Sequence, residues 1–395
     1  AGPDYSADPE NQFAKCRAAA KLGLRFAVQC PQPDEIKVAP VAGDEVSKDL
    51  HPLNDRPQRM AALPEVKLRE HVRAWMDRFL LDPELDAAVV AWAVTPEELR
   101  PWKQEEVAYL AIFSDEIQRH DPRHRPVFMY EPNHRTAQDL AATRGATSAL
   151  LMGLYTSLYG WTPRRAVRIN WAMDQILKEA DASGRLPVAG LELSQDLPGF
   201  SEKEIAAEPA KAEQLSTLIQ NDVWLALARG AKAIQVWSWH EARPKYTTNI
   251  RQVAAYAKAM QALTGSADLQ KPFLFGERRN DLRLAIAGGK EPMLAAGPAD
   301  AVAKDGWIKA GQWPAVRLVN LALDGSRTLL LVNSGTEPVE AIVSGFPAGW
   351  RYTAVVSVAG AVAKPHPDNP ASALAVSLPP FGVWMVLNIA QPGMP

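Results

Sequence analysis

The amino-acid sequence predicts an α/β fold, a TIM-like (β/α)8 barrel followed by an antiparallel β-sandwich. Two observations support this prediction. Short apolar runs alternate with helical patterns over the first two thirds of the chain, and after Gln261 the pattern changes to short β-type runs between turn residues. A length of 395 residues suits one barrel and a smaller domain. We therefore expect a catalytic barrel domain over 1–262 and a β-sandwich domain over 263–395.

Six apolar runs are expected to be strands, with helices between them. The expected strands are Leu24–Gln29, Ala87–Val94, Pro126–Tyr130, Ala149–Tyr155, Pro187–Leu193 and Ala233–Trp239. The expected helices are Leu68–Leu80, Lys103–His120, Thr136–Arg144, Pro163–Ser183 and Lys211–Arg229. Near-continuous apolar strands separated by helices are typical of a parallel sheet buried on both faces. A closed barrel needs eight strands, so either the first two are missing from this chain or the barrel is incomplete.

The last third of the chain is expected to form the sandwich. Residues Leu263–Pro272 are expected to be a turn-rich linker, because they contain Gly265 and Pro272. The expected strands beyond it are Phe273–Phe275, Leu282–Ile286, Ala315–Leu323, Thr328–Asn333, Glu340–Val343, Tyr352–Val356, Ala373–Leu378 and Val383–Asn388. The pair Asp324-Gly325 between two of these runs is a strong hairpin signal.

Composition excludes several classes of partner. A formal net charge of −2 provides no overall basic field for nucleic acid. The longest weakly charged apolar runs fall far short of the roughly 20 residues that cross a bilayer. The chain begins with Ala1 and shows no charged-then-apolar leader, as either a processed mature form or a trimmed chain would, which leaves export open. We expect a secreted or periplasmic protein, whose oligomeric state the sequence leaves open.

Polar residues follow the strand-like runs, at the end of the barrel where function is usually located. Glu97 and Glu98 follow the second run, and Glu192 interrupts an apolar stretch. A carboxylate in that stretch is costly to desolvate without partners. Glu192 is therefore either an ion-paired or hydrogen-bonded barrel residue or a carboxylate that faces the barrel mouth. Its polar neighbours favour the second interpretation. Thr95 and Glu98 match a capping box, which leaves Glu97 as the candidate catalyst.

Aromatic and polar side chains at the same strand ends could hold a sugar. Trp and Tyr offer flat apolar faces and hydrogen-bonding N–H and O–H groups. Glu131 is expected to bind substrate or to support another residue rather than to be a main catalyst. The full set of expected substrate-binding residues is Glu131, Asn133, His134, Tyr155, Trp161, Trp237, Trp239 and His240.

The sequence points to no cofactor and no metal. The histidines are scattered, without a His-x-x-x-His spacing or a thiol pair. Ser194 lacks a Gly-x-Ser-x-Gly elbow, and no Gly-rich phosphate loop follows any strand.

The order of these features resembles a known family. The features are a strand followed by Glu97, a later strand carrying Glu192, a final strand over Gln235–Trp239 and a β-sandwich that closes on Leu378–Val383. In this order they resemble the retaining (β/α)8 glycoside hydrolases of clan A with a C-terminal β domain. The resemblance implies that Glu97 is the acid/base at the end of strand 4 and Glu192 the nucleophile on strand 7. It also implies a substrate-contacting Trp on strand 8.

Two function hypotheses follow. The first is a retaining glycoside hydrolase that acts on a poly- or oligosaccharide through Glu97 and Glu192. The second is a carbohydrate-binding pseudoenzyme, favoured by the six-strand count and by Pro96, which stands where the clan has Asn.

Overall fold

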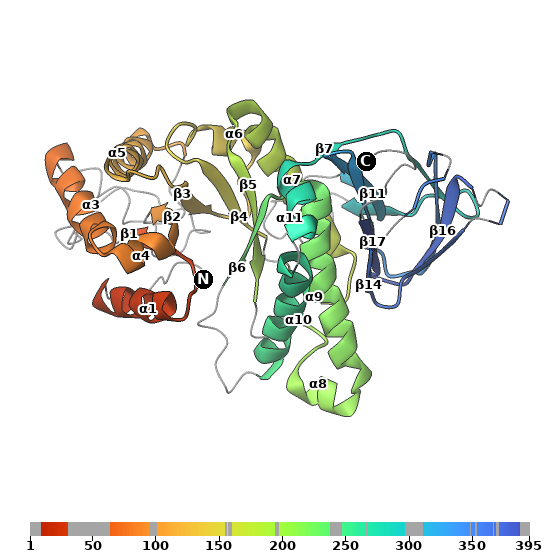
Figure 1. Ribbon diagram of the computed structural model, residues 1–395. Helices are drawn as coiled ribbons and strands as arrows, with labels where there is room; N and C mark the ends of the chain where they lie inside the picture. Colours follow the sequence, from red (N-terminus) through yellow and green to blue (C-terminus); the bar gives the residue numbers. More distant parts are fainter. Residues whose placement is uncertain are drawn as a thin grey trace. The chain divides into compact units, whose positions relative to one another are not determined.

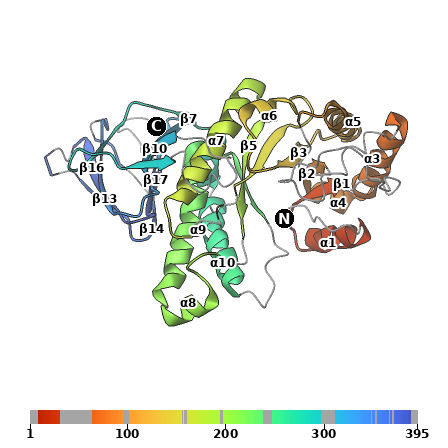
Figure 2. The same cartoon turned by 180° about the vertical axis from the view of Figure 1, so that it is seen from behind.

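The computed structural model describes residues 9–30, 64–94, 101–154, 156, 160–193, 197–237, 247–265, 267–296, 311–347, 349–351, 354–365, 367–368 and 371–387. The chain, whose helices and strands are labelled in Figures 1 and 2, divides into two compact units. Unit 1 comprises residues 1–153 and 175–188, and unit 2 comprises residues 154–174 and 189–395.

In the first two thirds of the chain, the residues that the structure describes form a parallel, curled six-stranded sheet, a half-barrel. Its strands are hydrogen-bonded in chain order: β1 (Phe26–Cys30), β2 (Val89–Val94), β3 (Val127–Glu131), β4 (Ala149–Gly153), β5 (Leu186–Glu192) and β6 (Ala233–Trp237). The six predicted strands and their order are therefore confirmed. Helix α7 (Arg164–Ser183) precedes β5.

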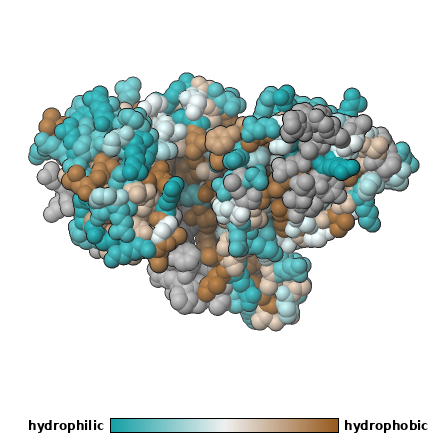
Figure 3. All heavy atoms as spheres, viewed as in Figure 1, coloured by the Kyte–Doolittle hydropathy of each residue, from teal (hydrophilic) through white to brown (hydrophobic). Residues whose placement is uncertain are grey.

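The helices of unit 1 pack on β1 to β3 and enclose a hydrophobic core. These helices are α1 (Pro9–Lys21), α3 (Glu65–Leu80), α4 (Pro83–Ala88) and α5 (Gln104–His120), and the short helix α6 (Ala137–Ala141) follows β3. Val72, Met76 and Phe79 of α3 are fully buried, and Phe79 meets Trp92 of β2 edge-on at 6.2 Å between ring centroids. The solvent-facing surface of the α3 and α5 region is mainly hydrophilic in Figure 3, as expected for amphipathic helices.

The start of the second strand differs from the prediction. Residues 87–88 are the last two residues of α4. The Asp82 side chain stabilises the start of this helix by accepting hydrogen bonds from the backbone N–H groups of Glu84 and Leu85. Pro83 at the first helical position favours the same start. β2 therefore begins at Val89.

The segment predicted as a linker is helical instead. Unit 2 contains α8 (Glu202–Ala207), α9 (Ala210–Arg229), α10 (Thr247–Thr264) and α11 (Ala267–Phe275). The prediction of a turn-rich linker over Leu263–Pro272 and of a strand over Phe273–Phe275 is wrong. Leu269 and Phe273 are buried, and the Phe273 ring lies 6.3 Å from that of Trp224, so packing offsets the cost of Pro272 inside the helix.

The remainder of unit 2 forms antiparallel sheets, as predicted. One sheet has the order β14-β17-β12-β11-β7, a second has the order β15-β16-β13-β8, and β10 pairs with β9. The strands are β7 (Glu277–Arg278), β8 (Arg283–Ile286), β9 (Met293–Ala296), β10 (Gly311–Pro314), β11 (Val316–Leu323), β12 (Ser326–Asn333), β13 (Val339–Ser344), β14 (Ala354–Val358), β15 (Val362–Pro365), β16 (Ala373–Leu378) and β17 (Val383–Leu387). Leu331 and Trp384 of the first sheet share a core with Val343 and Val376 of the second.

The predicted hairpin is confirmed. Leu323 of β11 pairs with Ser326 of β12, so Asp324 and Gly325 form a two-residue turn. Both have positive φ, 49° and 76°, which is the conformation that an Asp-Gly turn of this length requires. Among the helices in the described residues, none is long and apolar enough to cross a bilayer.

Candidate active site

Glu192 ends β5 at the carboxyl edge of the sheet. Ala189 and Leu191 are fully buried, whereas Glu192, which alternation turns to the opposite face from Leu191, is partly exposed. The hydroxyl of Tyr256, from α10, donates a hydrogen bond of 2.8 Å to the Glu192 carbonyl oxygen. The strand end that carries this carboxylate is therefore held by a buried side chain.

A buried ion pair lies near Tyr256 in the same unit. Arg165, in the first turn of α7, pairs with Asp222 in the middle of α9. The Thr156 hydroxyl donates to Asp222 Oδ2 at 3.0 Å, and Arg165 Nη1 donates to the Thr156 carbonyl at 2.6 Å. All three side chains are at most 2% exposed, so the cluster fixes the position of Thr156 after β4.

The electrostatics of this cluster follow from burial. Burial raises the pKa of Asp222, and the Arg165 guanidinium opposes this shift. Burial also raises the pKa of Tyr256 well above its ordinary value, and the charges of Asp222 and Glu192 raise it further. Tyr256 therefore remains a neutral phenol and keeps its proton for the bond to Glu192.

The start of the loop after β4 is also anchored. The Leu154 N–H donates to the Gly190 carbonyl at 2.7 Å, which ties the end of β4 to β5. Arg168 donates through Nε to the Leu154 carbonyl at 3.4 Å, and its guanidinium lies 5.0 Å from the Trp171 ring centroid. Leu154 and Arg168 are almost fully buried, so the backbone beside Glu192 is rigidly supported.

Trp161, predicted to bind substrate, packs against two other aromatic side chains. Its ring meets Phe381 edge-on, with centroids 4.5 Å apart, and lies 6.5 Å from Phe200. It remains partly exposed. Phe381 has a φ of 53°, a strained conformation for a bulky residue, and its carbonyl accepts a hydrogen bond from Asn221. Trp161 thus contacts the sandwich, and its role toward a substrate stays a prediction.

Glu131, at the end of β3 in unit 1, lies in a buried charged network. It shares a face of the strand with Val127 and Met129, which belong to the core under the helices. Its carboxylate lies 3.5 Å from Arg135 Nε and accepts a 3.5 Å bond from the Thr143 hydroxyl. Burial raises the pKa of Glu131 to about 7, although Arg135 and Arg185 oppose the shift. This environment suits a supporting residue.

Asn133 and His134 follow β3 in the same unit. Asn133 is buried and His134 is partly buried. Arg135, next in the chain, is buried, and its guanidinium lies 5.3 Å from the ring centroid of the exposed Trp102. Whether Asn133 and His134 contact a substrate stays a prediction.

The other predicted site residues lie outside the part of the chain that the structure describes. They are Glu97, Tyr155, Trp239 and His240. Trp237 is the last residue of β6, and only its backbone is described. Within the described ranges, no three His, Cys, Asp or Glu residues are grouped so as to hold a metal ion.

The Arg165–Asp222 pair and Tyr256 were not among the predicted residues. Two signals in the sequence could have indicated the pair. Asp222 ends a short polar run, Gln220-Asn221-Asp222, inside the otherwise apolar second half of α9, and a buried carboxylate there needs a partner. Arg165 lies in the first turn of a helix, where a positive charge opposes the helix dipole and requires a compensating partner. Tyr256 gave no comparable local signal.

Comparisons with known proteins show the fold. No family model and no curated protein matches the sequence. The structure of AmyP in complex with maltose is similar with a TM-score of 0.52 and 12% identity, covering 98% of this chain and 79% of that chain. The α-amylase from Geobacillus thermoleovorans, complexed with acarbose, is similar with a TM-score of 0.50 and 8% identity, covering 96% and 80%.

The chain thus has the fold of the TIM-barrel glycoside hydrolases with a C-terminal β domain, and the predicted fold class is confirmed. At these identities the likeness concerns the fold.

Proposed function

We propose that the protein is a glycoside hydrolase that cleaves a poly- or oligosaccharide with retention of configuration. The observation that carries the proposal is the partly exposed Glu192 carboxylate at the carboxyl end of β5, on a strand end fixed by Tyr256. In barrels of this kind the reacting groups lie at this edge of the sheet. The maltose and acarbose bound by the two similar proteins agree with a carbohydrate substrate.

In the proposed reaction, Glu192 is the nucleophile and Glu97 is the acid/base. The Glu192 carboxylate attacks the anomeric carbon while the bond to the leaving oxygen breaks, and the leaving oxygen takes the proton of Glu97. Glu97 then removes a proton from water, which attacks the anomeric carbon and releases the Glu192 carboxylate. The role of Glu97 rests on its position in the sequence, three residues after the end of β2.

The contacts of the described residues fit the nucleophile role. A nucleophile must be held within a fraction of an ångström of its productive position. Tyr256 fixes the backbone of Glu192, and the Leu154 N–H bond to Gly190 fixes β5 two residues earlier. These bonds hold the strand end during both displacement steps.

Activity of matched variants tests the proposal. We expect the wild-type protein to release reducing sugar from at least one member of a panel of starch, xylan, β-glucan and mannan. Glu192→Gln should lower the rate by several orders of magnitude, because it removes the nucleophile. Glu340→Gln, on an exposed strand position of the sandwich, should leave the rate unchanged. Full activity of Glu192→Gln would overturn the assignment.

The same panel decides between cleavage and the alternative of a carbohydrate-binding pseudoenzyme. Binding of a polysaccharide without any product from it would establish the alternative. We also propose that the protein acts outside the cytoplasm, and cell fractionation of the source organism with an antibody tests this.

A further inference from the structure

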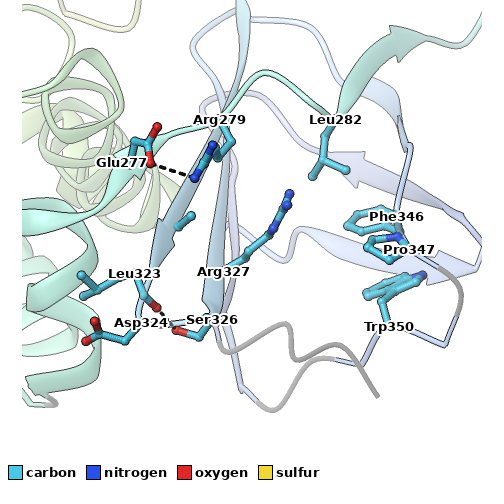
Figure 4. Close-up of a pocket in the computed structure, with 12 residues that line it drawn as sticks. Glu277, Arg279, Leu282, Leu323, Asp324, Ser326, Arg327, Phe346, Pro347 and Trp350 are labelled. Atoms are coloured by element: carbon cyan, nitrogen blue, oxygen red, sulfur yellow. Dashed lines mark hydrogen bonds and ion pairs between the residues drawn. The ribbon is translucent and has the colours of Figure 1, made fainter. Parts of the chain in front are cut away.

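A pocket of about 420 Å³ lies in the sandwich, entirely within unit 2. This volume falls in the range of about 300–1,000 Å³ that is typical of small-molecule sites. Three segments line the pocket: the β11–β12 hairpin, the segment before β8 and the loop after β13 (Figure 4). Its lining residues are Glu277, Arg279, Leu282, Ala322, Leu323, Asp324, Gly325, Ser326, Arg327, Phe346, Pro347 and Trp350.

One side of the pocket is aromatic. Phe346 and Trp350 stack with centroids 4.1 Å apart and an interplanar angle of 18°, and Pro347 lies beside them in Figure 4. Gly345 brings this loop close to the chain before β8: its φ is 99°, and a Cβ there would lie 2.9 Å from the Asp281 carbonyl oxygen. Phe346 is buried, so the aromatic side is anchored in the core of the sandwich.

The opposite side is polar and carries two ion pairs, of which the one made by Arg279 is largely exposed and the one made by Arg327 is partly buried. Arg279 pairs with Glu277 at 2.8 Å, and Arg327 pairs with Asp281 at 2.6 Å. Asp281 also accepts a 2.7 Å bond from Asn320 Nδ2, which fixes the partner of Arg327. Figure 4 shows Arg327 extending between the hairpin and the aromatic side. Because its partner is fixed, the Arg327 guanidinium is already oriented and loses little conformational entropy on binding.

The charges of the lining are balanced. Arg279 and Arg327 are positive, whereas Glu277 and Asp324 are negative. A phosphate or another polyanion would need an excess of positive charge. The combination of N–H donors and carboxylate acceptors with a flat apolar side suits a neutral polyol, because each sugar hydroxyl both donates and accepts and the ring has an apolar face.

We propose that this pocket is a second carbohydrate-binding site, which holds part of a neutral oligosaccharide between Phe346 and Trp350 on one side and Arg279 and Arg327 on the other. The proposal goes beyond the hydrolase function, because binding here involves no cleavage; only the advantage that binding gives to catalysis rests on that function. Such a site would keep the protein on a polymeric substrate by raising its effective concentration.

Affinity electrophoresis in native gels containing soluble starch, xylan, β-glucan or mannan tests the proposal. The experiment uses the Glu192→Gln protein, so that hydrolysis cannot remove the polysaccharide. We expect at least one neutral polysaccharide to retard this protein. Arg327→Met and Arg279→Met should each weaken the retardation about tenfold, because each removes charge-assisted hydrogen bonds.

Trp350→Ala tests the aromatic side, with far-ultraviolet circular dichroism to confirm folding, and should weaken binding comparably. The matched control is Arg283→Met, an exposed arginine of β8 outside the pocket lining, which should leave the retardation unchanged. Absence of retardation by all four polysaccharides would overturn the proposal. So would equal retardation of the Arg327→Met, Arg279→Met and Arg283→Met proteins, or binding of a proline-rich peptide in place of the polysaccharides.

Discussion

At the scale of single residues, the environment of each carboxyl group separates its possible roles. Glu192 is partly exposed at a strand end, whereas Glu131 is 4% exposed and surrounded by Arg135, Thr143 and Arg185. Both follow the same pattern in the sequence, a carboxylate at the end of an apolar strand. Burial, which depends on the fold around the strand, is what distinguishes them.

Glu131 should make stability depend on pH. Its pKa is about 7 in the folded protein against about 4.5 for an ordinary glutamate, so between these values the folded state binds more protons than the unfolded state. The contribution of the protonated Glu131 side chain to the free energy of unfolding is fully present below pH 4.5 and is lost as the pH rises to about 7. Across this range the free energy of unfolding should fall by on the order of 3 kcal/mol.

Urea unfolding of Glu131→Gln between pH 4.5 and 7.5 measures this contribution. The variant, which stays neutral, should show a flatter pH profile than the wild type. Glu340→Gln, an exposed strand carboxylate, serves as the control and should keep the wild-type profile. A Glu131→Gln profile parallel to that of the wild type would contradict the account.

At the scale of secondary-structure elements, one carboxylate organises the turn between α5 and β3. Asp121 accepts hydrogen bonds from Trp92 Nε1 at 2.8 Å and from the backbone N–H groups of Arg123 and Arg125, each at 3.0 Å. Burial alone would raise the pKa of Asp121, but these hydrogen bonds and the charge of Arg125 outweigh it and lower the pKa. Asp121 therefore stabilises the fold when ionised.

Asp121→Asn should lower the free energy of unfolding by about 2–3 kcal/mol at pH 7, because charge-assisted bonds become weaker and Arg125 loses a buried partner. The loss should shrink as the pH falls below the ordinary aspartate pKa of 3.8, because the stabilisation by the wild-type carboxylate is lost as the pH falls through its lowered pKa. Chemical denaturation at several pH values measures the effect. The control is Asp115→Asn, which alters a surface network of ion pairs and should change the free energy of unfolding by less than about 1 kcal/mol. An equal loss in both variants would contradict the proposed role of Asp121.

Some helices and strands can be predicted from the local sequence, and others depend on tertiary packing. The six strands were predictable because each is a short apolar run, and Asp324-Gly325 specified its turn. The helix α11 was missed because Pro272 and Gly265 are turn signals, while the burial of Phe273 that outweighs them is a tertiary effect. The Arg165–Asp222 pair joins residues 57 positions apart, a distance over which no local pattern operates.

At the scale of the whole molecule, unit 2 is held together by a polar contact between α9 and the sandwich. Asn221 Nδ2 donates to the carbonyls of Asn333 and Phe381 at 2.9 and 3.0 Å, and the Ser334 hydroxyl donates to Asn221 Oδ1 at 3.3 Å. Asn221 is 1% exposed. The helix that leads into β6 and the loops of the sandwich are therefore joined by buried hydrogen bonds.

Asn221→Ala should lower the free energy of unfolding by about 2–3 kcal/mol, because it removes three hydrogen bonds of about 1 kcal/mol each. Differential scanning calorimetry measures this as a lower Tm. The control on the same helix is Glu213→Ala, which removes an exposed side chain and should leave Tm nearly unchanged. If Asn221→Ala melted like the wild type, the contact would contribute nothing to the cohesion of unit 2.

The central claim is that Glu192 is a nucleophile, and covalent trapping tests it most directly. The protein is incubated with activated 2-deoxy-2-fluoro glycosides of the sugar that it releases, and peptides are mapped by mass spectrometry. The account predicts a glycosyl adduct on the peptide that contains Glu192, and no adduct in Glu192→Gln. An adduct on a different carboxylate, with Glu192 unmodified, would contradict it.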